Sequence, residues 1–131
     1  MKILVSLFIL FLPLSVFGEV YYCVVEKNTG FSWTDSYKNQ TVFNNERYVV
    51  EIDFNKNELK SEDLSINTDF GHVCLSDPRY DEMQCINGWS GSFTINKINL
   101  NFLYSTGLGF LLEDDIANND IALFYGKCEK F

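Results

Sequence analysis

Four cysteines constrain the fold of this 131-residue chain more than any other feature of its sequence. They are Cys23, Cys74, Cys85 and Cys128, and the last of them stands only three residues before Phe131. An even number of cysteines in a small exported domain is typical of a disulfide framework. Three pairings are open, and the local sequence distinguishes between them.

The segment between Cys74 and Cys85 predicts a hairpin that pairs these two cysteines. Its Asp-Pro pair is a strong turn signal, and a four-residue loop over 78–81 sets Asp77 opposite Glu82. Counting back along the ladder then sets Cys74 opposite Cys85. Opposed residues have Cβ atoms about 4.5 to 5.5 Å apart, within reach of a disulfide after slight adjustment.

Cys23 and Cys128 are then paired by elimination. This bridge would make the first and last strands of the domain neighbours. In the loop-entropy model, closing a loop of order 100 residues contributes about 4.7 kcal/mol, against about 3 kcal/mol for a loop nearer 15 residues. We therefore expect two disulfides, of which the long one is the more stabilising.

The first 18 residues have the pattern of a secretory signal peptide. Lys2 precedes an apolar run over 3–14, and Val16 and Gly18 stand three and one residues before a break after Gly18. The apolar run is shorter than the about 20 residues that a transmembrane helix needs. We therefore expect cleavage of residues 1–18, and no stable membrane insertion afterwards.

The remaining residues, 19–131, are enough for one domain. Without Lys2, nine Lys and Arg stand against 18 Asp and Glu, a formal charge of −9. A negative charge of this size repels nucleic acid and anionic membranes and favours a basic partner. We expect a single acidic domain, periplasmic or secreted, that does not bind nucleic acid.

Residue usage and patterning both predict strands. Only Ala117 and Ala122 are alanine, whereas Phe, Tyr, Ile and Val are plentiful. Residues 46–54 alternate apolar and polar, as a half-buried strand does. Two segments with the same pattern, 54–59 and 95–100, are predicted to form tight hairpin turns in which Asn tolerates unusual backbone angles.

Nine short strands are expected, at 19–26, 46–54, 59–66, 72–76, 82–87, 92–95, 100–104, 109–113 and 120–128. Their short links require antiparallel neighbours, because a parallel crossover needs a dozen or more residues. The prediction is an all-β antiparallel meander of eight to nine strands with two disulfides. Closure into a small barrel would hide its edges, and a two-sheet β-sandwich is the alternative.

Residues 28–45 do not read as strand and form a long connection rich in aromatic side chains. Long loops in compact domains are often functional, and the aromatics speak against disorder. Two interpretations stay open: a plug for one end of the barrel, or a binding surface. The candidate binding residues are Phe31, Trp33, Tyr37 and Phe43.

No catalytic residues, metal ligands or cofactor are predicted. His72 is the only histidine, so a nucleophile and its base are hard to assemble. In residues 88–92, GWSGS, a serine stands where the second Gly of a nucleophile elbow is required. Glu113, Asp114, Asp115 and Asp120 lack the spacing of an EF-hand loop, and no CxxC pattern suggests zinc.

Five short stretches of the mature chain form a recognisable frame: Tyr22-Cys23, Thr29-Gly30-Phe31, Phe54-Asn55-Lys56, Cys85-Ile86-Asn87 and Gly126-Lys127-Cys128-Glu129-Lys130-Phe131. This frame is similar to a group of short exported cysteine-containing proteins of marine bacteria with AT-rich genomes. The resemblance covers most of the mature chain and brings no functional residues with it.

A second likeness is to the periplasmic inhibitors of C-type lysozyme, small disulfide-bearing barrels with an early Tyr-x-Cys and a Ser-Gly-x-x-Tyr motif. Tyr21-Tyr22-Cys23 and Ser90-Gly91-Ser92-Phe93 resemble these motifs, with Thr94 at the position of the second tyrosine. The resemblance implies an acidic inhibitor facing a basic enzyme, which suits a charge of −9.

The sequence as a whole therefore predicts an exported protein that binds a partner and catalyses nothing. The partner is expected to be a basic protein, such as a lysozyme-type enzyme that it inhibits, or a small apolar ligand. A hydrolase that uses two carboxylates is the remaining alternative, because such enzymes need only a pair of acids across a cleft.

Overall fold

The computed structural model describes residues 18–88, 91–107 and 120–131. The predicted signal peptide, apart from Gly18, and the predicted strand at 109–113 lie outside these ranges. The strands are β1 (Glu19–Phe31), β2 (Gln40–Thr41), β3 (Arg47–Asp53), β4 (Glu58–Ser61), β5 (Ile66–Asn67), β6 (Val73–Asp77), β7 (Glu82–Ile86), β8 (Ser92–Asn96), β9 (Asn101–Thr106) and β10 (Ile121–Lys130). Two short 3-10 helices are η1 (Trp33–Asp35) and η2 (Thr68–Phe70).

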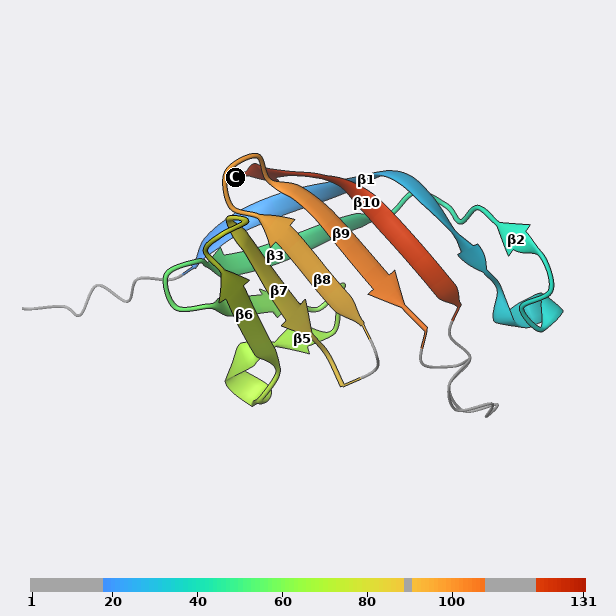
Figure 1. Cartoon of the computed structure of the whole chain (residues 1–131), viewed down its shortest axis with the longest axis horizontal. Helices are drawn as coiled ribbons and strands as arrows, with labels where there is room; N and C mark the ends of the chain where they lie inside the picture. The colour runs from blue at the N-terminus through green and yellow to red at the C-terminus, as the bar shows by residue number, and fades with distance from the viewer. Residues whose placement is uncertain (1–17, 89–90, 108–119) are drawn as a thin grey trace, which may run out of the picture.

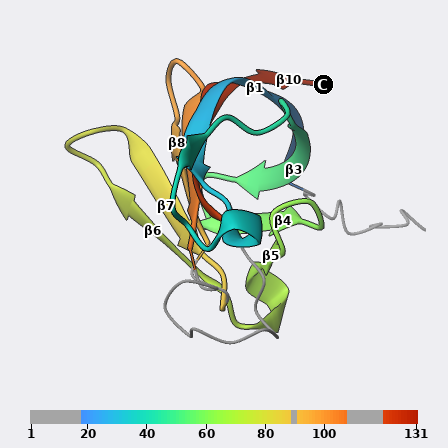
Figure 2. The ribbon, with the colours of Figure 1, turned by 90° about the vertical axis from the view of Figure 1, so that its right-hand side faces the viewer.

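Nine of these strands form one antiparallel sheet that curls into a half-barrel. Their hydrogen-bonded order is β5-β4-β3-β1-β10-β9-β8-β7-β6, and β2 pairs with the end of β1. β1 and β10 lie at the crest of the curl, with β3 and β4 on one side and β7 and β6 on the other (Figures 1 and 2). The predicted all-β antiparallel meander is confirmed, as one sheet rather than a two-sheet sandwich.

The first and last strands of the chain are paired, and the sheet is open between two strands from the middle of the chain. β1 pairs with β10 from Tyr21 to Phe31, whereas the two ends of the sheet are β5 and β6. Across this seam, the Asn67 N–H donates to His72 Nδ1 at 2.9 Å, and the side chains of Ser76 and Asn57 are hydrogen-bonded. Within the described ranges no ladder links β5 to β6, so the curl is a half-barrel.

Both disulfides have the predicted pairing. Cys74 stands opposite Cys85 in the β6–β7 ladder, and the register also sets Asp77 opposite Glu82. Cys23 stands opposite Cys128 in the β1–β10 ladder. The two bridges therefore fasten one local hairpin and the junction of the two terminal strands. Such bridges persist in oxidising compartments outside the cytosol.

β1 and β10 approach each other so closely that two positions require glycine. A Cβ added to Gly126 would lie 1.9 Å from the carbonyl oxygen of Val24, and one on Gly30 would lie 1.9 Å from that of Ile121. The ladder also shifts register after Val25, which is the pattern of a β-bulge and adds local twist. Glycine at these two positions thus lets the paired strands approach closely where the sheet curves.

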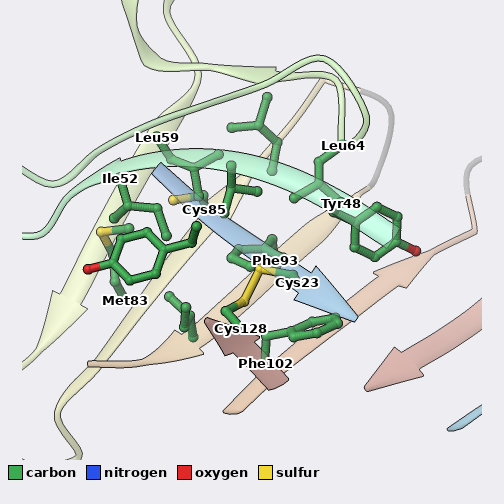
Figure 3. Packing of buried hydrophobic residues seen from close by; sticks show 14 of the residues in the cluster. Cys23, Tyr48, Ile52, Leu59, Leu64, Met83, Cys85, Phe93, Phe102 and Cys128 are labelled. Carbon is green, nitrogen blue, oxygen red and sulfur yellow. A yellow bond between two sulfur atoms is a disulfide. The ribbon is translucent and has the colours of Figure 1, made fainter. Parts of the chain in front are cut away.

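The concave face of the sheet holds the hydrophobic core. Tyr48, Val50 and Ile52 point inward along β3, which confirms the alternation predicted for this segment. Phe93 is fully buried at the centre, close to the Cys23–Cys128 bridge (Figure 3). Side chains from both halves of the curl meet there and fill the space between them.

Aromatic rings extend the core from its centre toward one end of the half-barrel. Phe93 stacks on Phe102 at a centroid distance of 5.6 Å, and Phe102 contacts Tyr48 at 6.0 Å. Tyr48 then contacts Tyr104 at 5.7 Å, and Tyr104 stacks on Phe124 at 6.1 Å. Aromatic pairs at these distances add about 0.5–1.5 kcal/mol each beyond their burial.

The predicted turns at 54–59 and 95–100 are confirmed as hairpin connections, with one difference. In the first, Asn57 adopts a positive φ of 54°, as expected for Asn. In the second, Leu100 takes the positive φ of 61°. Asn96 serves there as an acceptor, since its Oδ1 binds the backbone N–H groups of Ile98 and Asn99 at 2.8 and 3.0 Å.

The prediction of a single strand at 59–66 is wrong, because this segment forms two strands, β4 and β5, that pair as a hairpin. Ser61 Oγ accepts from the Leu64 N–H at 3.3 Å, and the Ser65 N–H donates to the Glu62 carbonyl at 3.1 Å. Ser65 also has a positive φ of 53°. A serine side chain that binds the backbone two to four residues away favours a turn over a strand.

Candidate functional site

The candidate site is a projecting segment, here called the aromatic arm, formed by residues 28–45. The prediction that it contains no strand is wrong, because β1 continues to Phe31 and β2 folds back on it. Gly30 pairs with Thr41, and Phe31 pairs with Gln40. The arm extends beyond the ends of β8 and β9, with η1 at its tip (Figure 1).

Hydrogen bonds fix the tip of the arm. The Ser36 N–H donates to the Trp33 carbonyl and the Tyr37 N–H donates to the Ser32 carbonyl, both at 3.0 Å. Ser36 and Tyr37 have positive φ values of 59° and 61° and close the turn after η1. The Trp33 N–H also donates to Asp120 Oδ1 at 3.0 Å, which ties the tip to the residue before β10.

A buried asparagine fixes the base of the arm. Asn28 Nδ2 donates to the Phe43 carbonyl at 2.9 Å, and Asn28 Oδ1 accepts from the Phe43 N–H at 2.6 Å. Its Nδ2 also lies 3.3 Å from Asn45 Oδ1. One amide side chain thus satisfies both backbone groups of Phe43, much as a neighbouring strand would.

Replacing Asn28 with alanine should loosen the arm. The change leaves the N–H and the carbonyl of Phe43 without partners, and an unsatisfied buried polar group costs about 1–3 kcal/mol. Amide hydrogen exchange should show faster exchange at Phe43 and a lower free energy of unfolding. The matched control, Asn44→Ala, alters an exposed neighbour and should change neither quantity. Equal protection of Phe43 in the two variants would contradict this account of the arm.

The structure places the four predicted binding residues in two different environments. Phe31 and Trp33 are 38% and 42% exposed, and Tyr37 is half-buried in the turn after η1. Phe43 is half-buried and packs on Phe124 at 5.9 Å, where it continues the aromatic series of the core. Phe31 and Trp33 are therefore available to a partner, whereas Phe43 holds the arm to the half-barrel.

Val42 is a residue of this surface that the sequence reasoning missed. It is 75% exposed and lies between half-buried Thr41 and half-buried Phe43. Period-two alternation from an inward Phe43 would have placed Val42 outward. That signal was available only if the segment had been recognised as extended chain.

Two tyrosine hydroxyls in and beside the core donate hydrogen bonds to carboxylates, that of Tyr21 to Glu19 and that of Tyr48 to Glu46. Burial, together with the bond to Glu19, raises the pKa of Tyr21 to about 12. Burial is also the main cause that raises the pKa of Tyr48, which donates to Glu46, and the pKa of Tyr104. Each phenol therefore keeps its proton at neutral pH.

The residues weighed for catalysis have structural partners here. His72 Nδ1 accepts the Asn67 N–H, and all four cysteines are in disulfides. Asp120 accepts the Trp33 N–H, while Glu113, Asp114 and Asp115 lie outside the described residues. Within ranges 18–88, 91–107 and 120–131, no three His, Cys, Asp or Glu side chains gather as metal ligands would.

Two described residues of the segment that resembles the lysozyme-inhibitor motif, Gly91 and Phe93, are buried. Ser90 lies outside the described residues. Gly91 packs against the side chain of Asn87 and donates its N–H to Asn87 Oδ1 at 2.7 Å. Phe93 is buried in the core.

A second candidate site, which the sequence did not indicate, is a hollow on the part of the sheet formed by β1, β3, β4 and β5. It is bounded by β3, β4, the turn at 62–65 and η2, and is here called the acidic groove. Both apolar side chains and carboxylates line the groove. One of the apolar side chains, that of Phe70, is 84% exposed. A large aromatic exposed to that degree has no signature in the sequence, because Phe70 follows no alternating pattern.

No known protein family, curated protein or solved structure matches this chain. Within the described residues, no helix has the length and apolar character needed to cross a membrane.

Proposed function

We propose that this protein is an exported, non-catalytic binding protein that recognises a basic protein through its aromatic arm. The observation that carries the proposal is the exposure of Phe31 and Trp33 on a segment fixed at both its tip and its base. Rigid aromatic side chains are the commonest hot spots of protein interfaces. Because the arm is already ordered, little conformational entropy is lost on binding.

The composition of the arm supports contact with a protein. Its tip combines Trp33 and Tyr37 with short polar residues at 32, 34–36 and 39. Tyrosine and tryptophan with serine, asparagine and similar residues are also typical of antibody contact loops, where rings supply area and polar groups adapt. The net charge of −9 expected for the mature chain adds attraction toward a basic partner.

The packed interior favours binding at the surface over carriage of a small ligand inside. Phe93, Met83 and Leu59 fill the space beneath the sheet, and none of them is exposed. A non-catalytic role is supported by the oxidised cysteines and by the hydrogen bond that occupies His72. The disulfides support an oxidising location, for which we propose the periplasm or the surrounding medium.

Calorimetric titration with a basic C-type lysozyme at low ionic strength tests this function. We expect binding that weakens as salt is added, because charge attraction is screened. Trp33→Ala should weaken it about 10-fold or more, as loss of a hot-spot side chain does. Leu103→Ala is the matched control, since Leu103 is 43% exposed on the convex face of β9. No heat of binding, or equal losses in the two variants, would overturn the proposal.

A further inference from the structure

The floor of the acidic groove is a row of side chains on the convex face of the sheet. Val20 on β1 pairs with Glu51 on β3, Glu51 pairs with Lys60 on β4, and Lys60 pairs with Asn67 on β5. Cross-strand neighbours on one face lie about 4.5–5.5 Å apart at Cβ. Val49, two residues before Glu51, faces the same side, so the two valines form an apolar strip beside the carboxylate of Glu51.

The turn at 62–65 forms one wall, and hydrogen bonds fix it in place. Asp63 Oδ2 accepts from the Val49 N–H at 2.7 Å, and Ser61 Oγ donates to the Val49 carbonyl at 2.8 Å. The Leu64 carbonyl accepts from Asn87 Nδ2 at 2.9 Å, and the Leu64 side chain is buried in the core. The groove is therefore formed before any partner arrives.

The charges of the groove are unbalanced. Its lysine, Lys60, forms an ion pair with Asp69 at 2.8 Å, and this hydrogen bond raises the pKa of Lys60. Three carboxylates, Glu51, Glu62 and Asp63, also line the groove. With Lys60 engaged by Asp69, the groove presents negative charge next to exposed apolar side chains.

We propose that the acidic groove binds a short cationic segment of a partner protein in which Lys or Arg residues stand beside apolar ones. The cations would lie against Glu51 and Glu62, and the apolar side chains would contact Val20, Val49 and the ring of Phe70. Charge complementarity selects this occupant, because an acidic or neutral segment would leave the carboxylates unpaired. The groove and the aromatic arm share no residues, so this inference does not rest on the proposed function of the arm.

A synthetic hexapeptide of alternating Lys and Leu, acetylated and amidated, tests the proposal. In a titration of the isotope-labelled protein, amide chemical shifts should change around Val49, Glu51 and Phe70, and the affinity should fall as salt is added. Phe70→Ala removes an almost fully exposed ring, so the fold should tolerate it while the affinity falls. Glu51→Gln with Glu62→Gln should weaken binding about 10-fold. Asp63 is left unchanged because it also holds the Val49 N–H.

Two matched controls separate this site from general charge attraction. Glu26→Gln with Glu82→Gln removes the same charge from positions that do not line the groove and should leave the peptide affinity within about 2-fold, as expected of charges at a distance. The Glu-Leu hexapeptide should not bind. Trp33→Ala should leave the peptide affinity unchanged, which distinguishes the groove from the arm. Three results would each overturn the inference: an equal loss of peptide affinity in the two double variants, unchanged amide chemical shifts around the groove, or binding of the acidic peptide.

Discussion

Replacing Cys23 and Cys128 together with alanine is expected to lower the free energy of unfolding by about 4.7 kcal/mol. The two cysteines are 105 residues apart, so their bridge removes much of the conformational freedom of the unfolded chain. In the folded state the bridge joins β1 to β10 at the crest of the half-barrel. Without it, the junction of the terminal strands depends on the ladder and the core alone.

The Cys74–Cys85 bridge provides the matched comparison, because its cysteines are only 11 residues apart. Its removal by double alanine substitution should cost about 3 kcal/mol or less. Denaturant unfolding followed by circular dichroism gives both values, and the Cys23/Cys128 variant should show the lower midpoint. An unfolded Cys23/Cys128 variant beside a folded Cys74/Cys85 variant would agree with this order. A lower midpoint for the Cys74/Cys85 variant would contradict it.

Phe93→Ala is expected to cost about 3–5 kcal/mol, as loss of a fully buried aromatic ring does. The ring stacks on Phe102 and lies in the centre of the concave core, so the cavity left behind has walls from both halves of the curl. Thr94→Ala is the control, because Thr94 is the next residue of β8 and faces the opposite side. Unfolding midpoints within experimental error of each other would show that the sheet does not bury the face described here.

Local signals in the sequence were enough to predict much of the fold. The Asp-Pro turn fixed the register of Cys74 against Cys85, and the remaining pair of cysteines followed by elimination. The alternation over 46–54 predicted which face of β3 is buried. These features depend on residues close together in the chain, or on the small number of ways to pair four cysteines.

Features that depend on distant contacts could not be predicted. The segment over 59–66 reads as one strand, but Ser61 and Ser65 turn the chain within it and divide it into β4 and β5. The separate roles of Phe31 and Phe43 follow from Asn28, whose side chain turns Phe43 toward Phe124. Neither hydrogen bond leaves a pattern in the sequence.

The candidate site was predicted in part for the same reason. Aromatic content identified the segment that carries Phe31 and Trp33, but their exposure depends on the pairing of β2 with β1 and on the bond from Trp33 to Asp120. The acidic groove was not predicted at all. Its residues come from four strands, a turn and η2, and the pairing of β1, β3, β4 and β5 brings them together.

Site-specific photo-cross-linking shows whether the aromatic arm is the surface that contacts a basic protein. A benzophenone amino acid is placed at position 33 in one variant and at position 103 in another, and each is irradiated with the basic C-type lysozyme at low ionic strength. We expect a covalent adduct from position 33 that disappears at high salt, and none from position 103. An adduct from position 103 with none from position 33 would contradict this expectation.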